Sequence, residues 1–397
     1  MKTFIILKKH CKNVYLMGAG NYWYEEGVIG DDTSLLYRVF QFVLFTLYIS
    51  MTILETMAAA LGDFPKDEKG DSVAFTVSHI IVMIKIFSVM RNKGLIKIMN
   101  KNMVKVCAEY EEKTLMADMS RIININVVAY FVNVYGSMLC FIFEGLRKKF
   151  QDGSHFVTVV TYYPSFCDNS LAATIFRIST TLILIMMLMT MIVSVDGYTM
   201  MYLIMLKYKI ITLRHYLENL RKEFDRESKR DLRSASEELS NGLVKGIVMH
   251  SELIRMCKDI HKAFGTVMAL QVCQSSGSAV SLLLQMALSK DLTFIASMKI
   301  IFFVIALFFL LALFLCNAGE ITYQASLLSD AIFYCGWHAC DAQAQRRMGR
   351  IVAFSVAQGQ RPLVMKGFKM LELTYGTFLW VMRSTYSVFA LFYAQNK

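Results

Sequence analysis

Seven long apolar runs constrain this sequence more than any other feature. They occupy Leu35–Leu61, Val73–Met90, Ile122–Phe143, Ile175–Leu206, Phe264–Leu288, Ile300–Cys316 and Met370–Tyr393. Each reaches about the twenty residues that an α-helix needs to cross a hydrocarbon core of about 30 Å. A lipid core offers unpaired backbone groups no partner, and the runs lack the alternation of barrel strands. The predicted fold is therefore an all-α membrane protein with seven transmembrane helices.

The Lys and Arg residues are distributed unevenly between the segments that connect the runs. Of these residues, 29 lie in the N-terminal segment and in the loops after the second, fourth and sixth runs, against 7 in the other connections. Because cation-rich loops remain in the cytoplasm, this asymmetry predicts a cytoplasmic N-terminus and an extracellular C-terminus, the reverse of a G-protein-coupled receptor. The net charge of +11 then reflects loops beside anionic membrane lipid, and no nucleic-acid partner is expected.

Two cytoplasmic connections are predicted to contain helices of their own. Apolar residues recur every three or four positions between Leu243 and Phe264, and a second amphipathic stretch, Ile321–Phe354, ends before Gly359 and Pro362. We expect these helices to join subunits, the alternative being that they pack only within one chain. The chain then divides into 1–34 (cytoplasmic N-terminal segment), 35–206 (helices one to four), 207–263 (cytoplasmic helical extension), 264–317 (helices five and six), 318–368 (cytoplasmic anchor) and 369–397 (last helix and C-terminus).

An intramembrane enzyme is the weaker interpretation. It would need a polar catalytic pair at depth, for which His79 in the second run and Glu55 in the first are candidates. A lone histidine in apolar surroundings is more often a packing or ligand contact. Asp196 is expected near water, at the cytoplasmic end of the fourth run. No catalytic residue is therefore predicted.

The nine cysteines predict neither a metal site nor a disulfide framework. The loop after the sixth run contains one group of possible metal ligands, namely Cys335, His338, Cys340 and Asp341. Helical spacing would not turn all of these side chains toward one ion, so no metal or other cofactor is expected. Cys140 and Cys167 are the cysteines placed to meet outside the cell, and two separate thiols are favoured over a bridge.

The last part of the chain carries an ordered set of short motifs. They are Cys316-Asn317-Ala318-Gly319-Glu320, Ala331-Ile332-Phe333-Tyr334 followed by Trp337, Arg346-Arg347, Gln358-Gly359-Gln360-Arg361-Pro362, Gly367-Phe368-Lys369 and Arg383-Ser384-Thr385-Tyr386-Ser387. In this order they resemble the C-terminal signature of insect odorant receptors. The sequence departs from the family pattern at Val388, which stands before Phe389 where the family usually repeats an aromatic residue.

The resemblance implies a subunit of a ligand-gated, non-selective cation channel in the plasma membrane of a sensory neuron dendrite. In such channels an odorant-tuning subunit assembles with co-receptor subunits into a heterotetramer around one central pore. This chain lacks the extended loop that the co-receptor carries before its fifth helix, so it resembles a tuning subunit. A gustatory receptor of the related family is the nearer alternative, and a transporter or an intramembrane acyltransferase is the more distant one.

An odorant pocket is expected among the outer halves of the second, third, fourth and sixth helices. Small volatile ligands need a closed, mostly apolar cavity with a few polar groups, and methionine side chains adapt to ligand shape. The loop 144–174 is the external segment large enough to cover such a pocket. The candidate ligand-binding residues are Ser78, His79, Tyr130, Tyr135, Met138, Met186, Met187 and Phe302, although ordinary core packing is the competing explanation for each.

The last helix is expected to line the pore. Its hydroxyl residues and Arg383 make it too polar to face lipid on all sides. The resemblance places the narrowest point near the outer end of this helix, where rings of apolar side chains can exclude water. The candidate pore and gate residues are Tyr386, Phe389, Phe392 and Tyr393. An interfacial aromatic belt is the alternative for Phe392 and Tyr393.

Overall fold

The computed structural model describes residues 3–151, 153, 155–288, 294–368 and 370–395, and almost all of them are helical. The α-helices are α1 (Thr3–Leu16), α2 (Leu35–Leu61), α3 (Lys66–Arg91), α4 (Lys93–Lys105), α5 (Lys113–Gln151), α6 (Leu171–Met191), α7 (Gly197–Glu227), α8 (Leu232–Leu288), α9 (Phe294–Phe333), α10 (Ala342–Gly359) and α11 (Tyr375–Gln395). Shorter elements are the 3-10 helices η1 (Ala108–Tyr110) and η3 (Trp337–Ala339), the π-helix η2 (Ile192–Asp196), and the strands β1 (Lys366–Gly367) and β2 (Leu371–Glu372). The predicted all-α fold is confirmed.

Six helical stretches of the described residues are long and apolar enough to cross a membrane. They are Leu35–Leu61, Glu68–Arg91, Lys113–Gln151, Leu171–Glu227, Leu232–Met286 and Ile300–Ala339. Five of them contain one of the first six apolar runs completely, and Leu232–Met286 contains the fifth run except for its last two residues. Helix α11 is not among them, because Arg383 and several hydroxyl residues lower its hydropathy. A seventh span and the orientation of the termini therefore remain predictions.

Local sequence signals set the starts of several helices. Ser34 caps α2 by accepting a hydrogen bond from the backbone N–H of Tyr37, and Ser170 caps α6 by accepting one from Ala173. Pro65 precedes the first residue of α3, a position where the missing N–H costs nothing. Each serine supplies an acceptor and the proline lacks a donor at a helix end, where backbone N–H groups lack partners within the helix.

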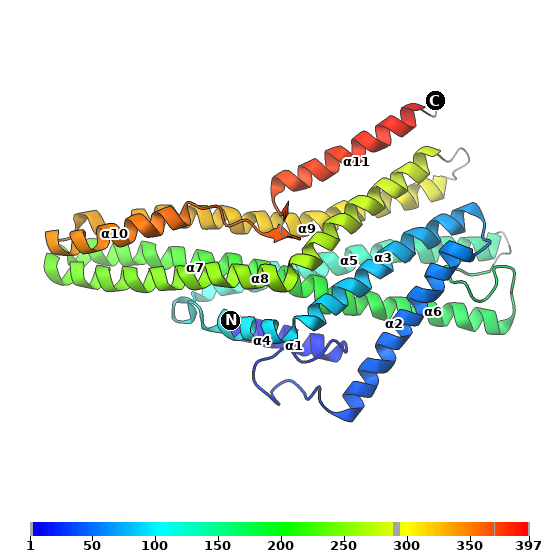
Figure 1. Cartoon of the computed structure of the whole chain (residues 1–397), viewed down its shortest axis with the longest axis horizontal. Coiled ribbons are helices and arrows are strands. Elements are labelled where there is room, and N and C mark those ends of the chain that lie inside the picture. Colours follow the sequence, from blue (N-terminus) through cyan, green and yellow to red (C-terminus); the bar gives the residue numbers. More distant parts are fainter. Residues whose placement is uncertain (1–2, 152, 154, 289–293, 369, 396–397) are drawn as a thin grey trace.

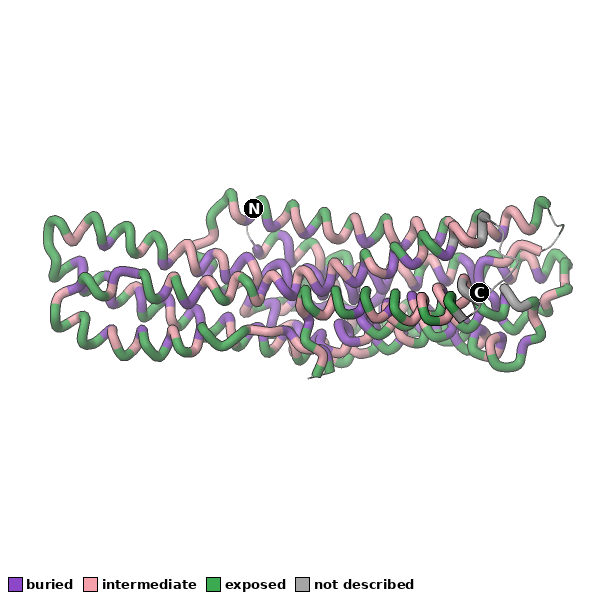
Figure 2. The backbone as a smooth tube through the Cα atoms, turned by 90° about the horizontal axis from the view of Figure 1, so that it is seen from above, coloured by how far each residue is buried: buried purple, intermediate pink, exposed green. Residues whose placement is uncertain are grey.

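The long helices form an elongated bundle (Figure 1). Helices α7, α8 and α9 pack on one another, and α10 lies against α9 at one end of the molecule. At the other end, α3 packs against α8 and α5 against α9, and α2 packs against α3 and α6. Helix α8 has 57 residues and is thus about 85 Å long, at 1.5 Å per residue. Buried residues follow the middle of the bundle along its whole length (Figure 2).

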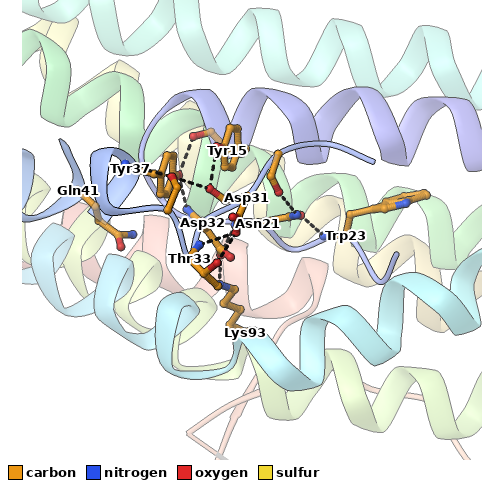
Figure 3. A network of polar contacts seen from close by, with 12 residues as sticks. Tyr15, Asn21, Trp23, Asp31, Asp32, Thr33, Tyr37, Gln41 and Lys93 are labelled. Atoms are coloured by element: carbon orange, nitrogen blue, oxygen red, sulfur yellow. Dashed lines mark hydrogen bonds and ion pairs between the residues drawn. The ribbon is translucent and has the colours of Figure 1, made fainter. Parts of the chain in front are cut away.

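The N-terminal segment is tied to the bundle by a polar network (Figure 3). The Tyr37 hydroxyl of α2 donates to the backbone carbonyl of Tyr15 at 2.8 Å, and the Tyr15 ring stacks on that of Tyr37. Asp32 accepts a hydrogen bond from the backbone N–H of Asn21 at 2.9 Å and pairs with Lys93, the first residue of α4. The segment between α1 and α2 is therefore held against α2 and α4.

The last apolar run begins differently from the prediction. Residues 370–374 are not helical: a short antiparallel hairpin pairs Lys366 with Glu372 and Gly367 with Leu371, and α11 begins at Tyr375. Gly367 lies so close to α8 that a Cβ atom there would stand 2.8 Å from the Cβ of Ala269. The Tyr375 hydroxyl donates to Glu320 of α9 at 2.8 Å, which fixes the start of α11.

Candidate functional site: a cavity in the helix bundle

A cavity of about 110 Å³ lies between α3, α5, α6, α8 and α9. Its lining is mostly apolar and consists of Phe75, Ser78, His79, Val82, Tyr130, Val134, Ser137, Met138, Phe141, Thr158, Leu184, Leu188, Met191, Gln271, Gln274, Phe303, Leu307 and Leu310. Thr158 comes from the loop between α5 and α6, and it shares a hydrogen bond with Thr181 of α6. The loop that was expected to cover a pocket thus contributes one residue to the cavity wall.

The size of the cavity restricts what it can hold. An apolar protein cavity of about 150 Å³ accepts benzene, whereas sites for drug-sized molecules measure roughly 300–1,000 Å³. A volume of 110 Å³ therefore fits a small molecule, and a somewhat larger one fits only if side chains move. Met138 and Met191 line the cavity, and their unbranched side chains change rotamer at little cost.

Three phenylalanines connect the helices on one side of the cavity. The Phe75 ring of α3 lies 4.9 Å from the Phe141 ring of α5, and Phe141 lies 5.6 Å from Phe303 of α9. The Phe141 and Phe303 rings meet edge to face at 87°, a favourable arrangement for aromatic pairs. A ligand in the cavity therefore contacts a wall that joins α3, α5 and α9.

His79 is held at the cavity wall by a carboxylate behind it. The Nδ1 atom of His79 lies 2.6 Å from Oε2 of Glu55 on α2, and both side chains are buried. The ring of Phe75 stacks on the imidazole at a centroid distance of 5.7 Å. Glu55 does not line the cavity, so it positions His79 and makes no contact with the cavity itself.

A second polar cluster lies beside the cavity and contains a buried ion pair. Nζ of Lys85 on α3 lies 3.6 Å from Oδ1 of Asp196, and neither side chain has any solvent exposure. Gln271 and Gln274 of α8 accept hydrogen bonds from Lys85, and the Tyr130 hydroxyl of α5 donates to Asp196. Tyr130, Gln271 and Gln274 also line the cavity. Three hydrogen-bond partners of the ion pair are therefore part of the cavity wall.

The π-helix η2 brings Asp196 to this position. It interrupts the chain between α6 and α7, and the N–H of Gly197 donates to the carbonyl of Ile192, five residues earlier. A Cβ atom at Gly197 would lie 2.4 Å from that carbonyl oxygen, so the π turn depends on glycine there. The expectation that Asp196 lies near water is wrong: the side chain faces Lys85 and Tyr130 in the protein interior.

The structure brings four of the eight candidate ligand-binding residues together. Ser78, His79, Tyr130 and Met138 line the cavity. The others lie elsewhere: the Tyr135 hydroxyl donates to the carbonyl of Ile185 at 2.9 Å, Met187 is buried, and Met186 and Phe302 are 44% and 53% exposed on the outer surface. Ligand binding by these eight residues remains a prediction.

Several lining residues were not predicted from the sequence. Phe75, Phe141 and Phe303 belong to the same apolar runs as the candidates and carried no separate signal. Gln271 and Gln274 did carry a sequence signal. They are two amides three residues apart, which places them on one face of a helix in an otherwise apolar run.

The candidate pore residues lie along α11, which packs against α8 and α9 on one side only (Figure 1). Tyr386 and Tyr393 are 68% and 48% exposed, and Phe389 and Phe392 are partly buried. The rings of Phe389 and Tyr393 stack at a centroid distance of 5.7 Å. Their role in a pore stays a prediction.

The cysteines have no role in either cluster. In the described part of the chain, no three His, Cys, Asp or Glu side chains are arranged to hold a metal ion. Cys140 and Cys167 are free thiols.

Comparisons with known proteins agree with this architecture. The sequence profile of the family described as "7tm Odorant receptor" matches residues 67–386. The insect olfactory receptor OR5 from Machilis hrabei superposes with a TM-score of 0.78 at 12% sequence identity, covering 98% of both chains. The same receptor in complex with eugenol gives a TM-score of 0.75 at 14% identity and the same coverage. Among curated protein sequences, none is significantly similar to this chain.

The profile match covers most of the chain, and the OR5 structures share its fold from end to end. A receptor family agrees with the expectation that the chain is not an enzyme, and six apolar helices agree with a multi-pass membrane location. This chain belongs to the odorant receptor family.

Proposed function

We propose that this chain is an odorant-tuning subunit of a heteromeric, odorant-gated cation channel. The observation that carries the proposal is the mostly apolar cavity between α3, α5, α6, α8 and α9. Its volume suits a small volatile molecule, and the complex of OR5 with eugenol supports such a ligand. The match to the odorant receptor family favours this function over a gustatory receptor.

A path from the cavity to the proposed pore supports gating by the ligand. Gln271 and Gln274 lie in the cavity wall, and the same helix, α8, packs against α11. A ligand can shift a closed–open equilibrium only through different contacts in the two states. Residues on α8 that contact both the ligand and the ion pair of Lys85 provide such a difference.

The exposed surface of α11 supports assembly with co-receptor subunits. Leu379, Trp380 and Tyr386 are large and more than half exposed within the single chain. An apolar surface of this kind on one helix suits contact with neighbouring subunits around a pore, with the remainder facing lipid. The proposed cytoplasmic N-terminus and extracellular C-terminus follow from the charge distribution.

Electrical recording tests the channel function directly. Cells that express this chain with an insect odorant co-receptor are expected to show odorant-evoked cation currents with a different odorant ranking from cells that express the co-receptor alone. A channel passes ions far faster than a transporter completes its cycle, and an enzyme passes none. Surface-expressed complexes that give no current with any odorant of a broad panel would refute the channel proposal.

The pore proposal predicts an effect of Phe389→Ala. If this ring forms part of an apolar constriction, shortening it admits water and is expected to raise resting current by on the order of twofold, the co-receptor subunits keeping the rest of the ring. Whole-cell recording of leak and reversal potential measures the change. Phe42→Ala, at a 71% exposed phenylalanine of α2, is the matched control. Equal leak and selectivity in both variants would contradict the pore assignment for this subunit.

A further inference from the structure

One histidine atom in the cavity wall is left free for a ligand. Nδ1 of His79 is engaged by Glu55 at 2.6 Å, and the stacked Phe75 ring restrains the imidazole. Among the described residues, Nε2 of His79 has no hydrogen-bond partner. Nε2 is therefore the polar atom that His79 can offer to a molecule in the cavity.

The charge of the His79–Glu55 pair decides whether Nε2 donates or accepts. Both side chains are buried, and no other cation of the described residues lies within ion-pair distance of Glu55. A net charge on this pair would be strongly unfavourable in an apolar interior, so the pair is neutral as a whole. It is neutral as imidazolium with carboxylate, or as imidazole that accepts the carboxylic O–H at Nδ1. Nε2 carries a hydrogen in both forms and is a donor. The remaining neutral form, with the acid proton on Oε1 of Glu55, is disfavoured because Oε1 is buried without a hydrogen-bond partner for that O–H.

Gln274 provides a second donor by a separate argument. Its Oε1 lies 3.2 Å from Nζ of Lys85, and an ammonium group can only donate, so the amide oxygen must face Lys85. The amide NH₂ of Gln274 is then left for the cavity. The hydroxyls of Tyr130 and Ser137 are already committed, to Asp196 and to a backbone carbonyl at 2.8 Å. The Ser78 hydroxyl, which also lines the cavity, can donate or accept, whereas Nε2 of His79 and the NH₂ of Gln274 can only donate.

We propose that this cavity selects small, mostly apolar molecules that carry one accessible acceptor oxygen, such as ketones, aldehydes and esters. His79 and Gln274 donate to that oxygen, and Glu55 positions and polarises His79. A hydrocarbon of the same shape fills the apolar part of the cavity but leaves both donors unpaired, which is costly above all for the buried His79. The inference rests on the proposed function and deepens it by naming the ligand class.

Matched pairs of ligands test the inference on the purified full-length receptor. Acetophenone with α-methylstyrene, and cyclohexanone with methylenecyclohexane, differ only in an oxygen replaced by CH₂. Affinities are obtained from ligand-dependent thermal stabilisation of the receptor. The carbonyl compound of each pair is expected to bind roughly fivefold to tenfold more tightly than its hydrocarbon partner. Equal affinities within the pairs, or no stabilisation by any of the compounds, would overturn the inference.

Substitutions test whether the preference for carbonyl ligands depends on the donors His79 and Gln274. The double variant His79→Phe with Glu55→Leu removes the pair without leaving a charge, and it is expected to bring the carbonyl-to-hydrocarbon affinity ratio close to one. Gln274→Met keeps the other partners of Lys85 and is expected to lower the ratio on its own, so it serves as the test if the double variant does not fold. Leu182→Met changes a 55% exposed residue of α6 outside the cavity lining and is expected to preserve the ratio.

The two proposals fail in different ways. A ratio that stays at the wild-type value in both donor variants would refute the role of His79 and Gln274. Because thermal stabilisation needs no current, a clear carbonyl preference in a receptor that never conducts would count against the channel function alone. Odorant-evoked currents with no preference within the pairs would count against the ligand class alone.

Discussion

Asp196→Asn is expected to remove most of the folded receptor. The substitution leaves the ammonium of Lys85 in a fully buried site with two amide oxygens but no carboxylate to balance its charge. Loss of one partner from a buried ion pair costs about 3–5 kcal/mol, which is a large part of the stability of most proteins. Fluorescence-detected size-exclusion chromatography and the thermal midpoint of the detergent-solubilised receptor measure the loss.

A double substitution distinguishes the effect of the unbalanced charge from the effect of altered packing. Lys85→Gln combined with Asp196→Asn removes both charges and leaves amides that can bond to each other and to Tyr130, so it is expected to recover much of the folded yield. Lys101→Met, at an exposed lysine of α4, is the control for loss of a single cation and is expected to have little effect. Wild-type stability of Asp196→Asn alone would show that the pair does not hold the bundle together.

Ser137→Phe is expected to abolish the odorant response while the receptor still reaches the cell surface. Ser137 lines the cavity from α5, and a phenyl ring there takes up much of a 110 Å³ space. The ring has an apolar cavity to enter, so strain in the fold is smaller than in a filled core. Odorant dose–response curves of receptor–co-receptor complexes, normalised to surface expression, are expected to lose their odorant-dependent current.

Ser179→Phe provides a close control for this variant. The Ser137 and Ser179 hydroxyls each donate to a backbone carbonyl of the same helix at 2.8 Å, but Ser179 lies on the exposed surface of α6. The same change of residue type therefore adds a ring outside the bundle and is expected to leave sensitivity unaltered. A Ser137→Phe receptor that keeps the odorant ranking and sensitivity of the Ser179→Phe receptor would mean that odorants bind elsewhere.

The sequence predicts the helices well because their causes are local. The first apolar run coincides with α2, which begins at a serine cap and ends where Gly62 follows. The start of α11 was wrong because Gly367 and Leu371 pair in a hairpin against α8, and contacts between distant segments decide that structure. Apolar patterning alone does not distinguish a helix turn from a short strand held in this way.

The site is less predictable because it depends on which helices meet. His79 and Tyr130 stand out as polar residues in apolar runs, and both line the cavity. Met186 and Phe302 belong to the correct helices, but they lie on the opposite face, and the sequence does not fix the rotation of a helix that is apolar on all sides. Asp196 was misplaced because its direction depends on a π turn, which leaves no simple pattern in the sequence.

The π-helix η2 determines which directions the side chains of α6 and α7 face relative to one another. A π turn holds one residue more than the α turn it replaces, and each residue of an α-helix advances the side-chain direction by about 100°. The extra residue therefore sets the angular phase of α7 independently of α6. Leu184 and Leu188 of α6 can face the cavity while Tyr198 and Tyr202 of α7 face the buried centre of the bundle. In lineages of this chain, insertions or deletions of single residues should be far less tolerated between Ile192 and Gly197 than in the exposed loop around Glu26, because each would rotate one face away from its partner.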